Sequence, residues 1–254
     1  MTDPVAAAVS AAVRNVGNAD WSSLIQPFDV SRFFSLNFKD IWWTSAPENL
    51  RPLRGKVELF AIYDIIGSEG LPLVPCPRPD VVLELMEATD TRARRAVLEQ
   101  RAPEVGEDCD DVFVGLQDSP HAGRYVAFAR DAVVAFRSGA HSSAQAMVSA
   151  LTTTILDEMK KSFDAVWRAA RYRGEGDDFP EILDEAPPYE YWVLAPLWHA
   201  YEKAVAGDLV DKWGRHSSIH KVSDVHYNVA NSVVSLMFLA ALLDFIALGS
   251  FADV

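Results

Sequence analysis

Apolar residues recur at spacings of three and four along the second half of the chain, a pattern that predicts amphipathic helices. Residues 141–162 carry such a stripe, formed by Ala144, Met147, Val148, Leu151, Ile155 and Met159. Residues 120–138 carry another before a stop at Gly139, formed by Tyr125, Phe128, Ala132, Val133 and Phe136. The last and most apolar predicted helix covers residues 228–248. No segment alternates strictly between apolar and polar residues, so we predict an all-α fold.

The first half of the chain is also predicted to be helical, with prolines marking where elements begin and end. The apolar run 57–66 fits a helix or a strand, and Gly67 follows it. Residues 67–79 contain four prolines and are predicted to form a loop, because each proline lacks a donor and restricts its predecessor. Two helices are expected next, over about 79–88 and from Thr89-Asp-Thr to Gln100.

A boundary is predicted at residues 117–120, where Ser119 and Pro120 have the character of a helix cap and a first-turn proline. We therefore divide the chain into two parts. Residues 1–118 form a helical N-terminal region to which the sequence assigns no role. Residues 119–254 form an up-and-down bundle of four to five helices.

The net negative charge of the chain excludes some classes of binding partner. Its 36 acidic and 23 basic residues give a net charge of −13, which argues against general DNA binding and against attraction to anionic lipid. A short basic cluster among acidic neighbours is expected on a solvated helix face: Arg92, Arg94 and Arg95. The chain has two cysteines and an acidic residue near its start, where a signal peptide needs cations, so we expect a cytoplasmic protein.

The apolar run 233–251 is long enough to raise the question of a membrane span. Asp244 lies within it and no lysine or arginine follows it. We therefore expect this run to be buried in a helical bundle, with no membrane contact.

The segment 213–228 contains the candidate catalytic residues. Three of the six histidines lie here, and Arg215 and His216 precede His220 by five and four residues. A turn at Tyr227-Asn228 then leads into the apolar helix, with Asn228 expected as its cap. Another histidine, His199, is expected to be buried with a partner.

The Arg-His-x-x-x-His element, placed before a helix that ends in Leu-Leu-Asp-Phe, resembles bacterial members of the HEPN (higher eukaryotes and prokaryotes nucleotide-binding) superfamily. The resemblance spans about residues 119–254. It implies an all-α bundle, a homodimer whose two motifs face each other, and metal-independent RNA cleavage. Such members act as toxins or in antiviral defence, so it also implies a cognate antitoxin or a sensor protein as partner.

Under this resemblance we expect an endoribonuclease that needs no metal or cofactor and takes its RNA substrate in a local groove. His220 is the expected general acid/base, since imidazole titrates near neutrality. Arg215 is the expected phosphate clamp, because its planar fork fits two phosphate oxygens. His216 would orient the substrate or transfer the second proton.

Other interpretations remain open on the sequence alone. Lys221 stands where close relatives often carry glycine, which leaves room for a non-catalytic HEPN-like module that binds nucleotide, RNA or a protein partner. Arg215 could instead pair with Asp211 or Asp224, and His216 with His220 could form half of a metal site. A helical assembly protein with an incidental histidine cluster is the third alternative.

Overall fold

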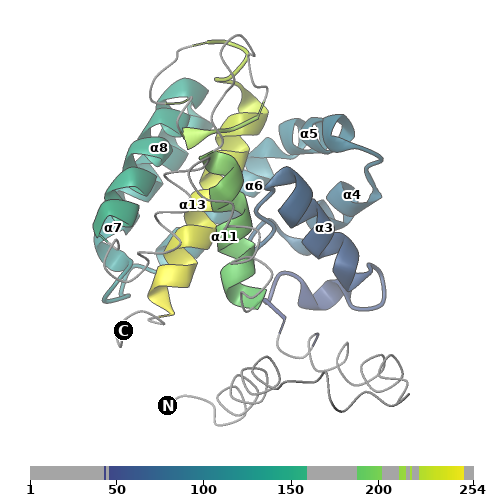
Figure 1. The fold of residues 1–254 in the computed structure, drawn as a ribbon. Helices are drawn as coiled ribbons and strands as arrows, with labels where there is room; N and C mark the ends of the chain where they lie inside the picture. Colours follow the sequence, from purple (N-terminus) through teal and green to yellow (C-terminus); the bar gives the residue numbers. More distant parts are fainter. Residues whose placement is uncertain are drawn as a thin grey trace, which may run out of the picture. The chain divides into compact units, whose positions relative to one another are not determined.

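The computed structural model describes residues 46–158, 188–201 and 223–248, together with Trp43, residues 212–215 and Ser218 (Figure 1). The chain divides into two compact units, Met1–Thr44 and Ser45–Val254, and the account below concerns the second. Its elements in chain order are η2 (Arg51–Leu53), α3 (Leu59–Glu69), α4 (Pro79–Glu87), α5 (Thr91–Gln100), α6 (Ala102–Gly115), α7 (Gly123–Arg137), α8 (His141–Glu158), α11 (Pro188–Ala200) and α13 (Val229–Ala247). The described ranges contain helices and no strand, which confirms the all-α prediction.

Helix α13 is the centre of the fold. It contacts α5, α6, α7, α8 and α11, so its apolar residues are buried around most of its circumference (Figure 1). Its bounds agree with the prediction, and the side chain of Asn228 caps it by accepting the backbone N–H of Asn231 at 2.8 Å. Among the described residues it alone is long and apolar enough to cross a membrane, yet most of it is covered by the chain's own helices.

The helices around α13 come from both sides of the predicted division after residue 118. Helices α5 and α6 precede that position, and α7, α8 and α11 follow it. Helix α11 also packs against α3. Elements of both predicted parts therefore pack around one helix, and the division of the chain after residue 118 stays a prediction.

Helix α7 differs from its prediction at the start and in its buried face. It begins at Gly123, because residues 119–122 form a turn in which the Ser119 hydroxyl accepts the N–H of Ala122 at 3.2 Å. The aromatic ring of Phe128 is exposed, whereas the smaller Val126 and Ala129 are buried. Helices α6 and α8 both pack on α7, and a close approach favours small side chains between them.

Helix α8 buries polar side chains that a hydrophobic pattern does not find. Gln145, Ser149 and Thr152 are fully buried, while the predicted core residue Met147 is 39% exposed. The last predicted residue of this stripe, Met159, lies outside the described residues. Of the buried polar residues, Gln145 donates to Ser218 and to the His226 carbonyl, whereas the Ser149 hydroxyl donates to the Gln145 carbonyl within α8.

Helix α3 settles the ambiguous run 57–66 as helix, and it continues past Gly67 to end at Gly70. Gly70 adopts the left-handed conformation, with φ +68°, that closes the helix. A Cβ added at Gly70 would lie 2.4 Å from Cβ of His199, so this glycine also lets α11 approach α3 closely. Helices α4 and α5 match their predictions, with Pro79 opening α4 and Asp90 capping α5.

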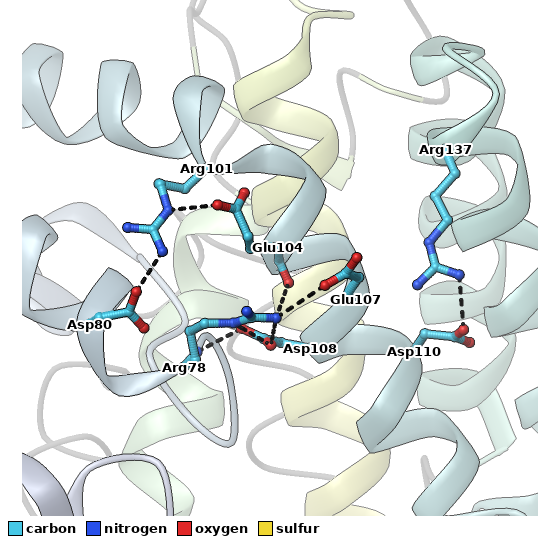
Figure 2. A network of polar contacts seen from close by, with 8 residues as sticks. All are labelled: Arg78, Asp80, Arg101, Glu104, Glu107, Asp108, Asp110 and Arg137. Carbon is cyan, nitrogen blue, oxygen red and sulfur yellow. Dashed lines mark hydrogen bonds and ion pairs between the residues drawn. The ribbon is translucent and has the colours of Figure 1, made fainter.

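An ion-pair cluster joins the short helices α4 and α5 to α6 and α7 (Figure 2). Arg78 binds Asp108 through its guanidinium, at 2.7 Å for the closest pair, and through its backbone N–H. Arg101 pairs with Asp80 of α4 and Glu104 of α6, and its bond to Asp80 lowers the pKa of that carboxyl. The cluster comprises Arg78, Asp80, Arg101, Glu104, Glu107, Asp108, Asp110 and Arg137.

Candidate functional site

Arg215 is half-buried and is held between α8 and the end of α11. Its Nε–H donates to Oγ1 of Thr153 at 2.8 Å, and its guanidinium carbon lies 5.4 Å from the centroid of the Tyr201 ring. The Thr153 hydroxyl in turn donates to the carbonyl of Ser149 at 2.8 Å, so its oxygen is oriented to accept from Arg215. These contacts fix the direction of the guanidinium through a neutral hydroxyl and an aromatic face.

No carboxylate of the described residues lies within ion-pair distance of Arg215. Asp224, one partner considered from the sequence, is exposed and accepts the backbone N–H of Val225 at 3.0 Å. Asp211, the other one, lies outside the described residues. Within the described residues, the hydrogen bond of the Arg215 guanidinium is the one from Nε to Thr153, and its terminal nitrogens carry further N–H donors.

The predicted catalytic partners of Arg215 are not placed. His216 and His220 lie outside the described residues, so their distance from Arg215 and their role in proton transfer stay predictions.

A buried polar junction holds Ser218 and the turn that precedes α13. We use this name for six residues: Arg95, Gln145, Ser218, His226, Asn228 and Asn231. The Gln145 amide donates to Oγ of Ser218 at 3.0 Å and to the carbonyl of His226 at 3.3 Å. Oγ of Ser218 lies 2.9 Å from Nε2 of His226, and the Asn231 amide donates to the His226 carbonyl at 2.7 Å.

The contacts of the junction show that the turn before α13 has a structural role. His226 is buried and serves the packing of this turn. Tyr227 donates its hydroxyl to the Ser218 carbonyl, and burial raises the pKa of Tyr227. The prediction that Tyr227 and Asn228 form the turn and the cap of the last helix is confirmed.

Arg95 was predicted on a solvated face, and this prediction is wrong. Its guanidinium donates to the side-chain oxygens of Asn231 at 2.9 Å and Asn228 at 3.3 Å, which joins α5 to the start of α13. Arg94 also turns inward, where it pairs with Glu69 and donates to the carbonyl of Ala88. Both arginines precede the buried Leu98 by three or four residues, and this helical spacing is the signal that places them on the inner face.

A cavity of about 250 Å³ lies beside the junction, where α3, α5, α11 and α13 meet. Arg95 belongs to both. His199 lines the cavity and donates from Nε2 to the Gly67 carbonyl at 2.8 Å, which confirms the prediction that this histidine has a partner. The lining residues are Ser68, Glu69, Gly70, Leu71, Thr91, Arg94, Arg95, Leu98, Pro196, His199, Ala200, Lys212, Trp213 and Val234.

The segment 212–215 connects the cavity to Arg215. Lys212 and Trp213 line the cavity, and the buried ring of Trp213 packs on Phe238 of α13 with centroids 5.1 Å apart. Arg215, two residues further, reaches α8 instead. This short segment thus carries a basic side chain at each end, Lys212 at its start and Arg215 at its end.

Other reactive groups of the described residues are packed in the interior. Cys76 and Cys109 are free buried thiols with their sulfurs 3.6 Å apart, and this contact, together with burial, raises the pKa of Cys109. A thiol held in its protonated form is a poor nucleophile. No cluster of three or more histidine, cysteine or acidic side chains suited to a metal ion occurs within the described ranges.

No protein-family model matches this chain, and no curated protein and no solved structure matches it either.

Proposed function

We propose that this protein is a metal-independent endoribonuclease of a cytoplasmic defence or toxin system. In this proposal Arg215 binds the scissile phosphate, His220 acts as the general acid/base, and His216 orients the substrate or transfers the second proton. The active form is a homodimer in which two copies of the motif face one RNA strand.

The observation that carries the proposal is the environment of Arg215. In a chain with 36 acidic residues, this guanidinium is held by a hydroxyl and an aromatic ring and by no carboxylate of the described residues. Arginine fixed in this way keeps its full charge and presents its outer edge as a fork for phosphate oxygens. Preorganised positive charge of this kind stabilises the negative charge on the phosphoryl oxygens in the transition state.

The chemistry follows from these groups. A base takes the proton of the ribose 2′-hydroxyl, and the 2′-oxygen attacks phosphorus. The bond from phosphorus to the 5′-oxygen breaks, and an acid protonates the departing oxygen. The products are a 2′,3′-cyclic phosphate and a 5′-hydroxyl, with no metal taking part. The acidic surface elsewhere would restrict RNA to this local groove.

The test compares the wild-type full chain with Arg215→Ala, Arg215→Lys and His220→Ala on end-labelled RNA in the presence of EDTA. We expect wild-type cleavage to leave cyclic phosphate ends, and each variant to lose at least about 100-fold in rate, the scale of one lost transition-state contact. Arg215→Lys should fail because an ammonium lacks the fork. Circular dichroism would verify that every variant is folded.

Arg92→Ala is the matched control, since Arg92 is an exposed arginine of α5 outside the site. It should cleave at the wild-type rate. Equal cleavage by wild type and Arg215→Ala, or loss of wild-type activity in EDTA, would overturn the proposal. Absence of cleavage by the wild type, with RNA binding that still depends on Arg215, would assign the chain to the non-catalytic binding module instead.

A further inference from the structure

The two cysteines of the chain meet in the interior of the fold. Cys76 lies in the segment between α3 and α4, and Cys109 lies in α6, 33 residues further along the chain. Their sulfurs are 3.6 Å apart, and both side chains are buried. The sequence contains two cysteines in all, so neither thiol has a competing partner in the same chain. Two thiols in contact are the arrangement from which an intramolecular disulfide forms.

An ion pair beside the two thiols holds their segments together. Asp108, the residue before Cys109, accepts the backbone N–H of Arg78 at 2.7 Å and its Nε–H at 2.8 Å (Figure 2). Arg78 follows Cys76 by two residues, so this ion pair joins the same two segments that carry the sulfurs. The Asp108 side chain is only 12% exposed, and water therefore competes little for the contact.

The segment that carries Cys76 is also anchored by Asn49. The Asn49 amide donates to the carbonyls of Leu73 and Pro77, each at 2.9 Å, and these carbonyls lie before and after Cys76 in the chain. Thiols that the fold already holds together react with each other at a high effective concentration. To reach the disulfide bond length their sulfurs must approach by about 1.5 Å, which rotations of roughly 30° about the two Cα–Cβ bonds can provide.

The surroundings of the two thiols favour a first reaction at Cys76. Contact with Cys76, burial and the neighbouring carboxylates Asp108 and Asp110 raise the pKa of Cys109. The thiolate is the reactive form, so Cys109 reacts slowly with an oxidant. Cys76 lies outside the helices, in a segment that local opening exposes more readily than the middle of α6.

From these observations we propose that Cys76 and Cys109 are a redox-active pair that hydrogen peroxide oxidises to a disulfide. The Cys76 sulfur attacks one peroxide oxygen, the oxygen–oxygen bond breaks, and the departing hydroxide leaves as water with the Cys76 proton. The Cys109 sulfur then attacks the sulfur of the Cys76 sulfenic acid. The sulfur–sulfur bond forms, the sulfur–oxygen bond breaks, and the hydroxyl leaves as a second water with the Cys109 proton. The thiols together lose two electrons, which reduce one peroxide to two waters.

The disulfide closes a loop of the chain that contains α4 and α5. Such a bond restricts the unfolded chain more than the folded one, so oxidation should stabilise the protein. Under reducing conditions the pair stays as two thiols, and the effect is therefore reversible. Arg215 takes no part in these steps, so the proposal holds or fails independently of RNA cleavage.

The experiment treats the reduced full chain with millimolar hydrogen peroxide, then denatures it and alkylates free thiols with N-ethylmaleimide. We expect intact mass spectrometry to show the loss of two hydrogen atoms and no alkylation, and peptide mapping to join Cys76 to Cys109. The melting temperature should rise by at least about 5 °C and return with dithiothreitol. Two thiols still alkylated after peroxide, sulfinic or sulfonic acid on either cysteine, or a disulfide between two chains would overturn the proposal.

The matched variants Cys76→Ser and Cys109→Ser test the order of the steps. After peroxide, Cys109→Ser should carry a sulfenic acid on Cys76 that dimedone labels, whereas Cys76→Ser should keep a free thiol. Neither variant should gain melting temperature on oxidation. A gain equal to that of the wild type, or labelling of Cys109 in place of Cys76, would overturn the proposal. The mass measurement on the wild type needs no variant, so a variant that fails to fold leaves that test decisive.

Discussion

The ion-pair cluster and the polar junction both depend on arginine, but they use it in different ways. In the cluster, Arg78 and Arg101 are bound by carboxylates of α4 and α6, so each positive charge is cancelled where it lies (Figure 2). In the junction, Arg95 is bound by the amide oxygens of Asn228 and Asn231. Arg215 nearby is bound by the Thr153 hydroxyl. A neutral acceptor orients a guanidinium without cancelling its charge.

This difference separates arginines whose charge is cancelled by a carboxylate from arginines that are held by neutral acceptors. Acidic residues outnumber basic ones, so an arginine on an open helix face readily finds a carboxylate, as Arg130 and Arg137 do with Asp110. A neutral acceptor such as the Thr153 hydroxyl orients Arg215 and leaves its positive charge in place. The comparison predicts that the junction and the cluster respond differently to substitution.

The largest effect on stability is expected from Asn231→Leu in the junction. Asn231 is fully buried, and its amide serves both the His226 carbonyl and the Arg95 guanidinium. A leucine of similar size removes one hydrogen bond from each of these groups and places an apolar side chain against them, which should lower the free energy of unfolding by about 2–4 kcal/mol. Urea denaturation measures this change. Asn228→Ser is the matched control, since it keeps a helix cap and should lose less than about 1 kcal/mol. Equal losses in the two variants would contradict the role given to the junction.

A smaller effect is expected from Arg78→Met in the cluster. The Asp108 side chain is only 12% exposed, so it would lose its cation in a place with little water. We expect a loss of about 2 kcal/mol in the free energy of unfolding. Adding Asp108→Asn should recover part of it, because the buried charge is then removed. Arg130→Ala, at a pair whose arginine is 47% exposed, should cost less than about 1 kcal/mol. A loss from Arg130→Ala as large as that from Arg78→Met would remove the distinction between buried and exposed pairs.

Asp244 provides the third test, as a carboxylate with no cation of the described residues in ion-pair distance. Burial raises the pKa of Asp244 above its ordinary value of 3.8. The folded state therefore holds this proton more tightly than the unfolded state, and stability falls as the pH rises through the raised pKa. We expect Asp244→Asn to be more stable than the wild type at pH 7, with the advantage vanishing below about pH 4. Denaturation from pH 3.5 to 7.5 would show this. A constant difference across that range would indicate that ionisation is not the cause.

Local signals in the sequence were sufficient for most helix ends. Pro79, Asp90 and Asn228 each act within one turn of their own helix, through a fixed φ or a side chain that accepts a nearby N–H. Such contacts involve neighbours along the chain, so the residue types alone predict them. The start of α7 is one exception, because the turn at residues 119–122 uses the same residue types as a helix cap. The end of α3 is another, because the helix continues through Gly67 to Glu69, inside the segment 67–79 that was predicted to be a loop.

The buried face of a helix was harder to predict where the surface of the neighbouring helix determines which side chains are buried. Val126 and Ala129 are buried in preference to the larger Phe128, and Gln145 is buried in preference to Met147. The size and polarity of the facing element determine such a choice, and a one-dimensional pattern of apolar residues does not contain them. Of the predicted site residues, Arg215 is described and His216 and His220 are not, so the histidine roles stay predictions.

From the order of its residues alone this chain specifies an all-α fold, the ends of most helices and an apolar helix that needs burial. The reason is that propensity, capping and apolar spacing act over a few residues. Folding in three dimensions assigns each arginine its partner. Arg215 and Thr153 are 62 residues apart, and Arg95 and Asn231 are 136 apart. Packing of distant helices therefore determines whether an arginine meets a carboxylate or a neutral acceptor.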